Sequence, residues 1–296
     1  MTSKPLQTPP YNPSRPRLPF YQTLQFRNAL FLILLTLLTF VWMIPVIWTV
    51  STSLRTELAI QRDLGRLIPE AVTFENWTFL LSKSRLPRWF FNSLGVSVIH
   101  TILQLVICSL GAYAFARLKF IGSNVLYTLV LAGLMVPFQV TFIPVYVMFS
   151  DFNWLNTYGA LIIPGVASPF AVFLLTQFFK NVPMELEEAA YLDGANRFQV
   201  YWRIILPLSI PALTTLAIFA FLGNWNSYLW PLIAATKQEV MTLPIGLAKV
   251  SQSWGFVNFY GRNMAAAALS ALPIVLFVFA FQRKIISGIS INSGIK

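Results

Sequence analysis

The sequence predicts an all-α membrane protein with six transmembrane helices. Of its 296 residues, 56% are hydrophobic and only 10% are charged, whereas soluble domains carry about 25% charged residues. Six intervals of the chain lack charged residues, and each is long enough for the roughly 20 apolar residues that cross a bilayer as a helix. The predicted spans are 28–54, 89–116, 120–150, 152–179, 204–236 and 263–282.

The N-terminal residues 1–27 are rich in proline and polar residues and show no hydrophobic periodicity. They are predicted to form a flexible tail, because such a composition cannot bury enough apolar surface to fold. The first apolar run is too long for the core of a signal peptide, so it is predicted to be a retained span. Residues 28–296 then form one transmembrane domain.

The net charge of +11 does not indicate a nucleic-acid partner, because the basic residues are spread over the ends of the apolar runs. The positive-inside rule places cations there on the cytoplasmic side. The short loop with Arg117 and Lys119 is purely basic, and the short loop at Asp151 has no cation. Both termini and segment 181–206 are therefore predicted to be cytoplasmic. The lone Cys108 excludes a disulfide within the chain.

The predicted spans lack Asp, Glu, Lys and Arg in their interiors, although transporters driven by ion gradients usually place ionisable groups there. His100 is the one candidate for a proton relay, and its other interpretation is a hydrogen-bonded packing residue. The chain has no G-x-x-x-x-G-K-S/T phosphate loop, no metal-ligand cluster and no G-x-S-x-G nucleophile motif. This favours a transport subunit that takes its energy from a partner over an enzyme.

Segment 181–206, between the fourth and fifth predicted spans, is polar and amphipathic. Asn181 and Pro183 suit a helix start, because an amide side chain caps free N–H groups and proline has none to satisfy. Gly194 is a good helix end, because glycine adopts left-handed backbone geometry without a clash. Three acidic residues fall in the first turns, where they favour the helix dipole: Glu185, Glu187 and Glu188.

A second short helix is predicted from Asn196 to about Ile205. Phe198, Tyr201, Trp202 and Ile205 recur at spacings that place them on one helical face. An apolar face of this kind either rests on lipid headgroups or docks in the groove of a partner protein. Periodicity leaves both interpretations open.

Residues 188–195 read EAAYLDGA and are followed by Ile204 and Leu206-Pro207. They resemble the E-A-A-x-x-D-G-A signature in the cytoplasmic loop of permease subunits of ABC-type importers. Further pieces resemble carbohydrate importer permeases, above all the smaller permease of maltose-type systems, and the resemblance covers about residues 25–296. These pieces are LNTYG at 155–159, WN at 225–226, LWP at 229–231, TLPIGL at 242–247 and the C-terminal FQR, Gly288 and GIK.

The resemblance implies a type I ABC importer permease fold with a cytoplasmic coupling helix, in a bacterial-type cytoplasmic (inner) membrane. It implies three partners besides lipid: a second permease, an ATPase dimer that holds ATP and Mg, and an extracytoplasmic solute-binding protein. No cofactor is expected in this chain. The coupling residues carried over are Glu188, Ala189, Ala190, Asp193, Gly194, Ala195, Phe198, Trp202 and Pro207.

In this family the loop docks on the ATPase, so the resemblance makes Glu188 a contact and Gly194 the hinge of the loop. Phe198, Tyr201 and Trp202 either anchor the second helix to the permease or fill the partner's groove. The outer loops 55–88 and 237–262 are expected either to face the binding protein or to cap the helices.

The expected function is import of a sugar or related polyol. Amide, hydroxyl and aromatic side chains within the spans are the candidates for the substrate path, although the same residue types also form hydrogen bonds between membrane helices. The alternative is a membrane-embedded enzyme or scaffold whose amphipathic loop only rests on the bilayer. The candidates are Gln104, Gln139, Thr141, Asn224, Trp225, Asn226, Ser227 and Tyr228.

Overall fold

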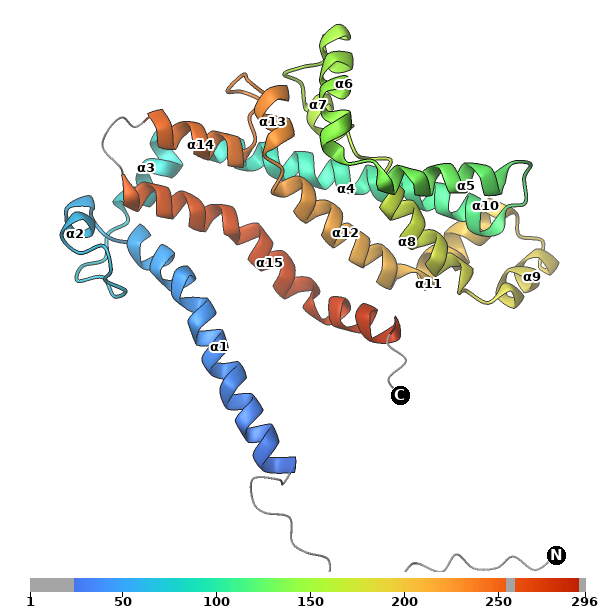
Figure 1. Ribbon diagram of the computed structural model, residues 1–296, viewed down its shortest axis with the longest axis horizontal. Coiled ribbons are helices and arrows are strands. Elements are labelled where there is room, and N and C mark those ends of the chain that lie inside the picture. Colours follow the sequence, from blue (N-terminus) through green and yellow to red (C-terminus); the bar gives the residue numbers. More distant parts are fainter. Residues whose placement is uncertain (1–23, 254–258, 293–296) are drawn as a thin grey trace, which may run out of the picture. The chain divides into compact units, whose positions relative to one another are not determined.

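The computed structural model describes residues 24–253 and 259–292, and every regular element in these ranges is a helix (Figure 1). The chain divides into two units, Met1–Thr49 and Val50–Lys296. The elements are α1 (Leu24–Ser53), α2 (Glu57–Arg62), α3 (Glu75–Lys83), α4 (Leu86–Arg117), α5 (Ser123–Ala132), the 3₁₀ turn η2 (Gly133–Met135), α6 (Phe138–Asp151), α7 (Tyr158–Ile162), α8 (Pro169–Lys180), α9 (Met184–Leu192), α10 (Arg197–Val200), the π-helical turn η3 (Tyr201–Ile205), α11 (Leu206–Leu208), α12 (Ile210–Trp225), α13 (Leu229–Ala234), α14 (Leu243–Ser253) and α15 (Tyr260–Asn292).

Among the described residues, three helices are long and apolar enough to cross a membrane as single spans. They contain the stretches Phe26–Ser53, Leu86–Arg117 and Tyr260–Phe281, which correspond to the first, second and sixth predicted spans. Helix α1 already begins at Leu24, so the last residues of the predicted tail are helical. The rest of that tail, residues 1–23, lies outside the described residues.

The other three predicted spans are not single helices. In interval 120–150 the chain bends by 101° between Ser123–Met135 and Phe138–Asp151. Pro137 lies at this break and has extended backbone. The helix breaks here because proline has no N–H with which to continue it. In interval 204–236 the chain bends by 77° between Arg197–Leu208 and Ile210–Trp225. Pro211 follows this second break and starts α12.

Interval 152–179 folds as two short helices, α7 and α8. Asn153, Asn156 and Gly165 have left-handed backbone geometry, which α-helices do not accommodate. Pro169 then restarts the helix, with the Ser168 side chain as its cap. The described residues therefore contain three apolar helices of spanning length, or up to five if each bent pair is one span. Turn geometry, which hydropathy does not register, accounts for the difference from six.

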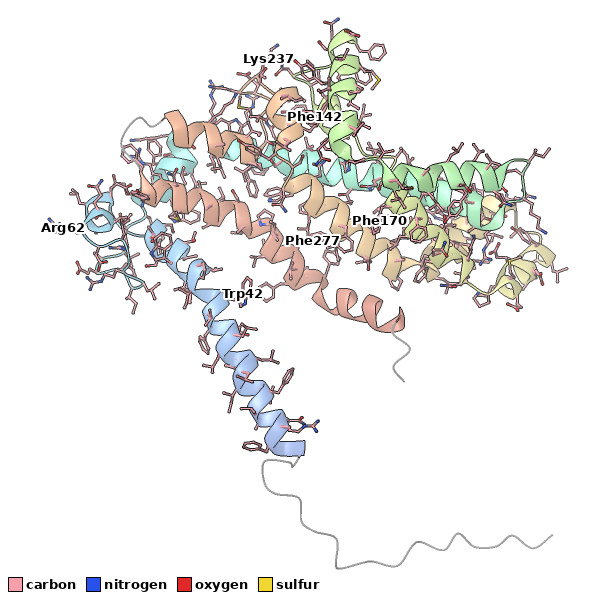
Figure 2. All side chains as sticks on the ribbon, viewed as in Figure 1. Trp42, Arg62, Phe142, Phe170, Lys237 and Phe277 are labelled. Atoms are coloured by element: carbon pink, nitrogen blue, oxygen red, sulfur yellow. The ribbon has the colours of Figure 1, made fainter. Side chains whose placement is uncertain are left out.

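Helix α4 is central to the unit Val50–Lys296, because it packs against α7, α8, α12 and α14. Figure 1 shows α9 and α10 at one end of α4, and α3 and α14 at its other end. Three apolar clusters include residues of α4, and the two largest lie toward its two ends. One joins Cys108 and Ala112 of α4 to α8, to segment 200–205 and to the start of α12. The other joins Trp89 of α4 to α3, α14, α15 and the end of α12, where Phe277, labelled in Figure 2, stacks on Phe221.

The two predicted outer loops are held by hydrogen bonds to backbone carbonyls. Buried Arg55 donates to the carbonyl oxygens of Ala59 and Asp63, both at 2.7 Å. In the second loop, Asn92 of α4 donates to the carbonyls of Glu239 and Met241, both at 2.9 Å. Arg55 is therefore part of the internal structure of its loop, because a buried cation needs such acceptors.

Candidate functional site

The first candidate site is the elbow, which we define as residues 182–208. Its first helix, α9, begins after Pro183, and Glu185 and Glu187 lie in its first turn as predicted. Asn181 is not its cap: this residue ends α8, where its N–H bonds to the Phe178 carbonyl at 3.1 Å. The predicted cap is wrong because α8 continues to Lys180 and takes Asn181 as its own terminus.

Helix α9 ends at a Schellman motif, in which a left-handed residue lets two N–H groups fold back onto the last carbonyls. The N–H of Gly194 donates to the Tyr191 carbonyl at 3.0 Å, and that of Ala195 donates to the Ala190 carbonyl at 2.9 Å. Gly194 has a φ of +82°. The predicted role of glycine at this turn is confirmed.

The second helix of the elbow starts at Asn196, as predicted. The Asn196 side chain accepts the Gln199 N–H at 2.9 Å, and the Gln199 side chain accepts the Asn196 N–H at 2.8 Å. This reciprocal capping box satisfies two N–H groups that a helix start leaves free. The helix runs through α10, η3 and α11, with exposed Pro207 near its end.

The four residues predicted to share one apolar face lie in two environments. Tyr201 and Ile205 are buried, with 4% and 0% of their surfaces exposed. Phe198 and Trp202 are 65% and 62% exposed. The residues of the predicted apolar face therefore divide between the protein's own core and its free surface.

Tyr201 anchors the elbow to α4. Its hydroxyl forms a hydrogen bond with the Ser109 hydroxyl at 2.7 Å, and its ring lies 5.2 Å from the Tyr113 ring. The Tyr113 hydroxyl in turn donates to the Arg197 carbonyl at 3.2 Å. Of the two roles left open for the aromatic residues, Tyr201 therefore takes the anchoring one.

A buried ion pair joins the elbow to the end of α4, and the sequence did not indicate it. Arg117 Nε lies 2.6 Å from Glu187 Oε1, and the two side chains are 5% and 4% exposed. Burial raises the pKa of the Glu187 carboxyl, and the Arg117 guanidinium opposes that rise. Linear spacing gives no signal for this pair, because only the tertiary fold brings the two residues together.

The remaining coupling candidates surround the bend between the two helices. Glu188, Ala189, Asp193 and Gly194 are exposed, whereas Ala190 and Ala195 are partly buried against the core. A depression of about 290 Å³ lies at the bend, with Asp193, Gly194, Gln199 and Arg203 in its lining. Exposed acidic side chains, exposed apolar side chains and a depression therefore all lie on the surface of the elbow.

A second candidate site is a pocket of about 340 Å³ beside the middle of α4. Among the predicted substrate-path residues, Gln104, Asn224 and Ser227 line it. The aromatic side chains of Phe170, labelled in Figure 2, and Phe219 also contribute to the lining. Amides and a hydroxyl beside aromatic rings can bind a polyhydroxylated ligand.

His100 also lines this pocket, and its Nδ1 lies 2.7 Å from the Ile162 carbonyl oxygen. This contact fits the interpretation of His100 as a hydrogen-bonded packing residue. Ser97 of α4 donates a hydrogen bond to the Asn224 side-chain oxygen at 3.2 Å, which holds that amide at the pocket.

The other substrate-path candidates lie away from the pocket. Trp225 is buried in the core, where its indole N–H donates to the Ser270 carbonyl at 3.2 Å. Asn226 is exposed and donates to the Leu222 carbonyl of its own helix at 3.0 Å. The last three candidates are exposed and do not line the pocket: Gln139 and Thr141 on α6, and Tyr228 before α13.

The described residues are all-helical and include three apolar helices of membrane-spanning length, as expected of a membrane transport subunit. Residues 106–291 match the family model described as "Binding-protein-dependent transport system inner membrane component", and the chain belongs to this family. Within the described residues, no cluster of three or more His, Cys, Asp and Glu side chains could hold a metal ion.

Curated relatives match the chain over nearly their whole length. It is 33% identical to the arabinooligosaccharides transport system permease protein AraQ of Halalkalibacterium halodurans, over 88% of this chain and 93% of the relative. It is 33% identical to the trehalose transport system permease protein SugB of Mycobacterium tuberculosis, over 84% and 90%. A chain of the solved bacterial ABC transporter that imports alginate superposes with a TM-score of 0.79 at 23% identity, over 90% of this chain and 99% of that one.

The fold is therefore that of a type I ABC importer permease. The prediction of a transport subunit rather than an enzyme is confirmed by the family, and the alternative of a membrane-embedded enzyme or scaffold is not supported. The location in the inner membrane likewise follows from the family description.

Proposed function

We propose that the chain is the permease subunit of an ATP-driven importer that moves a sugar or related polyol across the cytoplasmic membrane. The relatives named above transport arabinooligosaccharides and trehalose by their descriptions. The pocket beside α4 supports this substrate class, because amide and hydroxyl groups stand there beside two aromatic rings. We assign the substrate path to Gln104, Asn224 and Ser227.

The elbow is the proposed docking site of the ATPase, which holds ATP and Mg in its own chain. The observation that carries this assignment is the exposed pair Phe198 and Trp202, on a helix whose other edge is locked to α4 through Tyr201. A helix held on one side with large apolar side chains on the other is what helix-in-groove recognition requires. Glu188 lies exposed on the neighbouring helix and contacts the ATPase in this proposal.

The proposed topology has six crossings with both termini in the cytoplasm. The bent pair α5–α6 forms the third crossing, α7 with α8 forms the fourth, and α11 to α13 form the fifth. The outer segments 55–88 and 237–262 then face an extracytoplasmic solute-binding protein, and a second permease completes the pathway. A complex of an alginate ABC transporter with its substrate-bound periplasmic protein has a chain of similar fold, with a TM-score of 0.55.

The test of docking is purification of the tagged chain from membranes together with the ATPase. Glu188→Lys is expected to lower the amount of co-purified ATPase severalfold, because it reverses a charge on the exposed side of α9. Glu185→Lys is the matched control, since Glu185 is also exposed and lies in the same helix. It makes the same change in net charge at another position.

A native chain that purifies as a stable, active single subunit without an ATPase would contradict the proposal. Equal losses of ATPase in the two variants would contradict the specific role of Glu188 and attribute the effect to the net charge of α9.

A further inference from the structure

Glu187 is the one buried side chain of α9, although it is charged. Short amphipathic helices are usually held by apolar side chains. Here the guanidinium of Arg117, the last residue of α4, takes that role. It lies against the Glu187 carboxylate, donates to the Val182 carbonyl, and lies 3.0 Å from the Met184 sulfur through Nη1. One side chain of α4 thus contacts Val182, which precedes α9, and two residues in the first turn of α9.

A buried ion pair contributes little to stability, because removing two charges from water offsets their attraction. Apolar side chains of similar volume would hold α9 at least as firmly. The pair instead fixes the orientation of α9 relative to α4, since a planar guanidinium binds a carboxylate in few orientations. Two other ion pairs, Arg66–Glu70 and Arg85–Glu239, have largely exposed side chains.

Arg117 belongs to a stripe of polar residues along α4. Ser109, Tyr113 and Arg117 recur every four residues, so they lie on one face of the helix. Ser109 bonds to Tyr201 in η3, Tyr113 donates to the Arg197 carbonyl at the start of α10, and Arg117 meets α9. Three segments of the elbow, α9, α10 and η3, therefore each have their own contact on α4.

The same helix reaches the pocket. His100 and Gln104 of α4 line it, and Gln104 lies about one and a half helical turns before Ser109, the first of the residues that hold the elbow. Cys108, one turn after Gln104, donates to the Val166 carbonyl at 3.3 Å, next to pocket-lining Gly165. A displacement of the elbow that turns or shifts α4 therefore moves groups in the pocket wall.

We propose that the Arg117–Glu187 ion pair is a positioning element of energy coupling: it fixes α9 to the end of α4, so that movement of the elbow reaches the pocket through α4. The proposal rests on the proposed docking of the ATPase at the elbow. Neither residue touches substrate, and the pair acts by holding the exposed Glu188 surface in a fixed orientation relative to α4.

The test uses the intact complex of permeases and ATPase with a reporter thiol in the pocket. The reporter is Ser227→Cys in a Cys108→Ser background, so that this chain carries one cysteine. The rate of its labelling by N-ethylmaleimide is measured with and without ATP and vanadate. In the otherwise native chain, ATP with vanadate is expected to change the labelling rate severalfold, because trapping the ATPase in one state changes the pocket's access to water.

Glu187→Gln is expected to abolish the ATP-dependent change while the ATPase stays bound and hydrolyses ATP, because Glu188 is still present. Exchange of the charges in Arg117→Glu with Glu187→Arg is expected to restore part of the change. Glu185→Gln, an exposed neutralisation in the same helical turn, is the control and is expected to have no effect.

A normal ATP-dependent change in Glu187→Gln would overturn this proposal and leave the proposed function intact. Absence of both Glu187→Gln and Arg117→Lys from the membrane would also overturn it, since the pair would then serve folding. Failure of the native chain to bind an ATPase would instead refute the proposed function itself.

Discussion

At the scale of single residues, Gly194 fixes the shape of the elbow. Its φ of +82° lies in the left-handed region, which costs other residues about 1–2 kcal/mol. A Cβ added at this position would meet nothing within 4 Å. The requirement for glycine therefore comes from backbone conformation alone and not from close packing.

Two replacements of Gly194 are expected to differ in severity. Gly194→Ala should lower the stability of the complex by about 1 kcal/mol through backbone strain. Gly194→Pro should abolish ATP-driven transport, because proline cannot adopt positive φ and loses the N–H bond to the Tyr191 carbonyl. Thermal unfolding of the purified complex and transport in proteoliposomes measure the two effects.

Gly95→Ala in α4 is the control for these variants. Its added Cβ also meets nothing within 4 Å, but its backbone is helical, where alanine is favoured over glycine. It is expected to be neutral or slightly stabilising. Transport at the native level by Gly194→Pro would show that the bend does not transmit work.

At the scale of elements, α14 packs on α4 through Gly246. A Cβ at this position would lie 2.0 Å from the Trp89 ring. The Trp89 indole N–H also donates to the Gln238 carbonyl at 2.8 Å, so the ring cannot move aside without losing that bond. The closeness of the two helices and the position of the loop before α14 therefore depend on the same side chain.

Gly246→Ala is expected to destabilise the protein by about 1–3 kcal/mol, the usual cost of overpacking a core. Gly111→Ala in α4 is the matched control, because the added Cβ would meet only the Val172 side chain at 3.9 Å. Thermal unfolding and protease cleavage of loop 236–242 report the difference. Equal stability of the two variants would show that Trp89 repacks freely.

At the scale of the whole transport unit, α4 connects three regions of Val50–Lys296. The elbow is held at its end, the pocket lies beside its middle, and the loop 236–242 is bonded to its start. The pocket lining combines the polar side chains of His100, Gln104 and Asn224 with apolar and aromatic ones, whereas the cores toward the two ends of α4 are apolar. A lining of mixed polar and aromatic groups is a suitable place for a hydroxylated substrate.

Asn224 and Asn226 offer a direct test of this pocket. Asn224→Ala is expected to lower uptake of the sugar delivered by the binding protein about fivefold, the effect of one lost hydrogen bond of about 1 kcal/mol. Asn226→Ala should leave uptake nearly unchanged, because its side chain is exposed and bonds within its own helix. Uptake of radiolabelled sugar by vesicles measures both, and an equal effect would contradict the assignment of the pocket.

Features that depend on near neighbours in the chain could be predicted from the amino-acid sequence. Long charge-free intervals predicted membrane helices, and three of them are single helices of spanning length. Asn196 and Gly194 predicted a helix start and a helix end, because capping depends only on near neighbours in the chain. The EAAYLDGA segment and its flanking motifs predicted the family, which the relatives confirm.

The packing of the helices shows which residues of a sequence pattern are buried in the protein's own core and which remain exposed. Periodicity grouped Phe198 with Tyr201, but α4 offers hydroxyl and ring partners to Tyr201 alone. Asn224 and Asn226 were likewise both candidates for the substrate path because of their amide side chains. In the structure only Asn224 lines the pocket, and Asn226 bonds to its own helix. The Arg117–Glu187 pair had no sequence signal, because contact between residues far apart in the chain is decided by how helices pack.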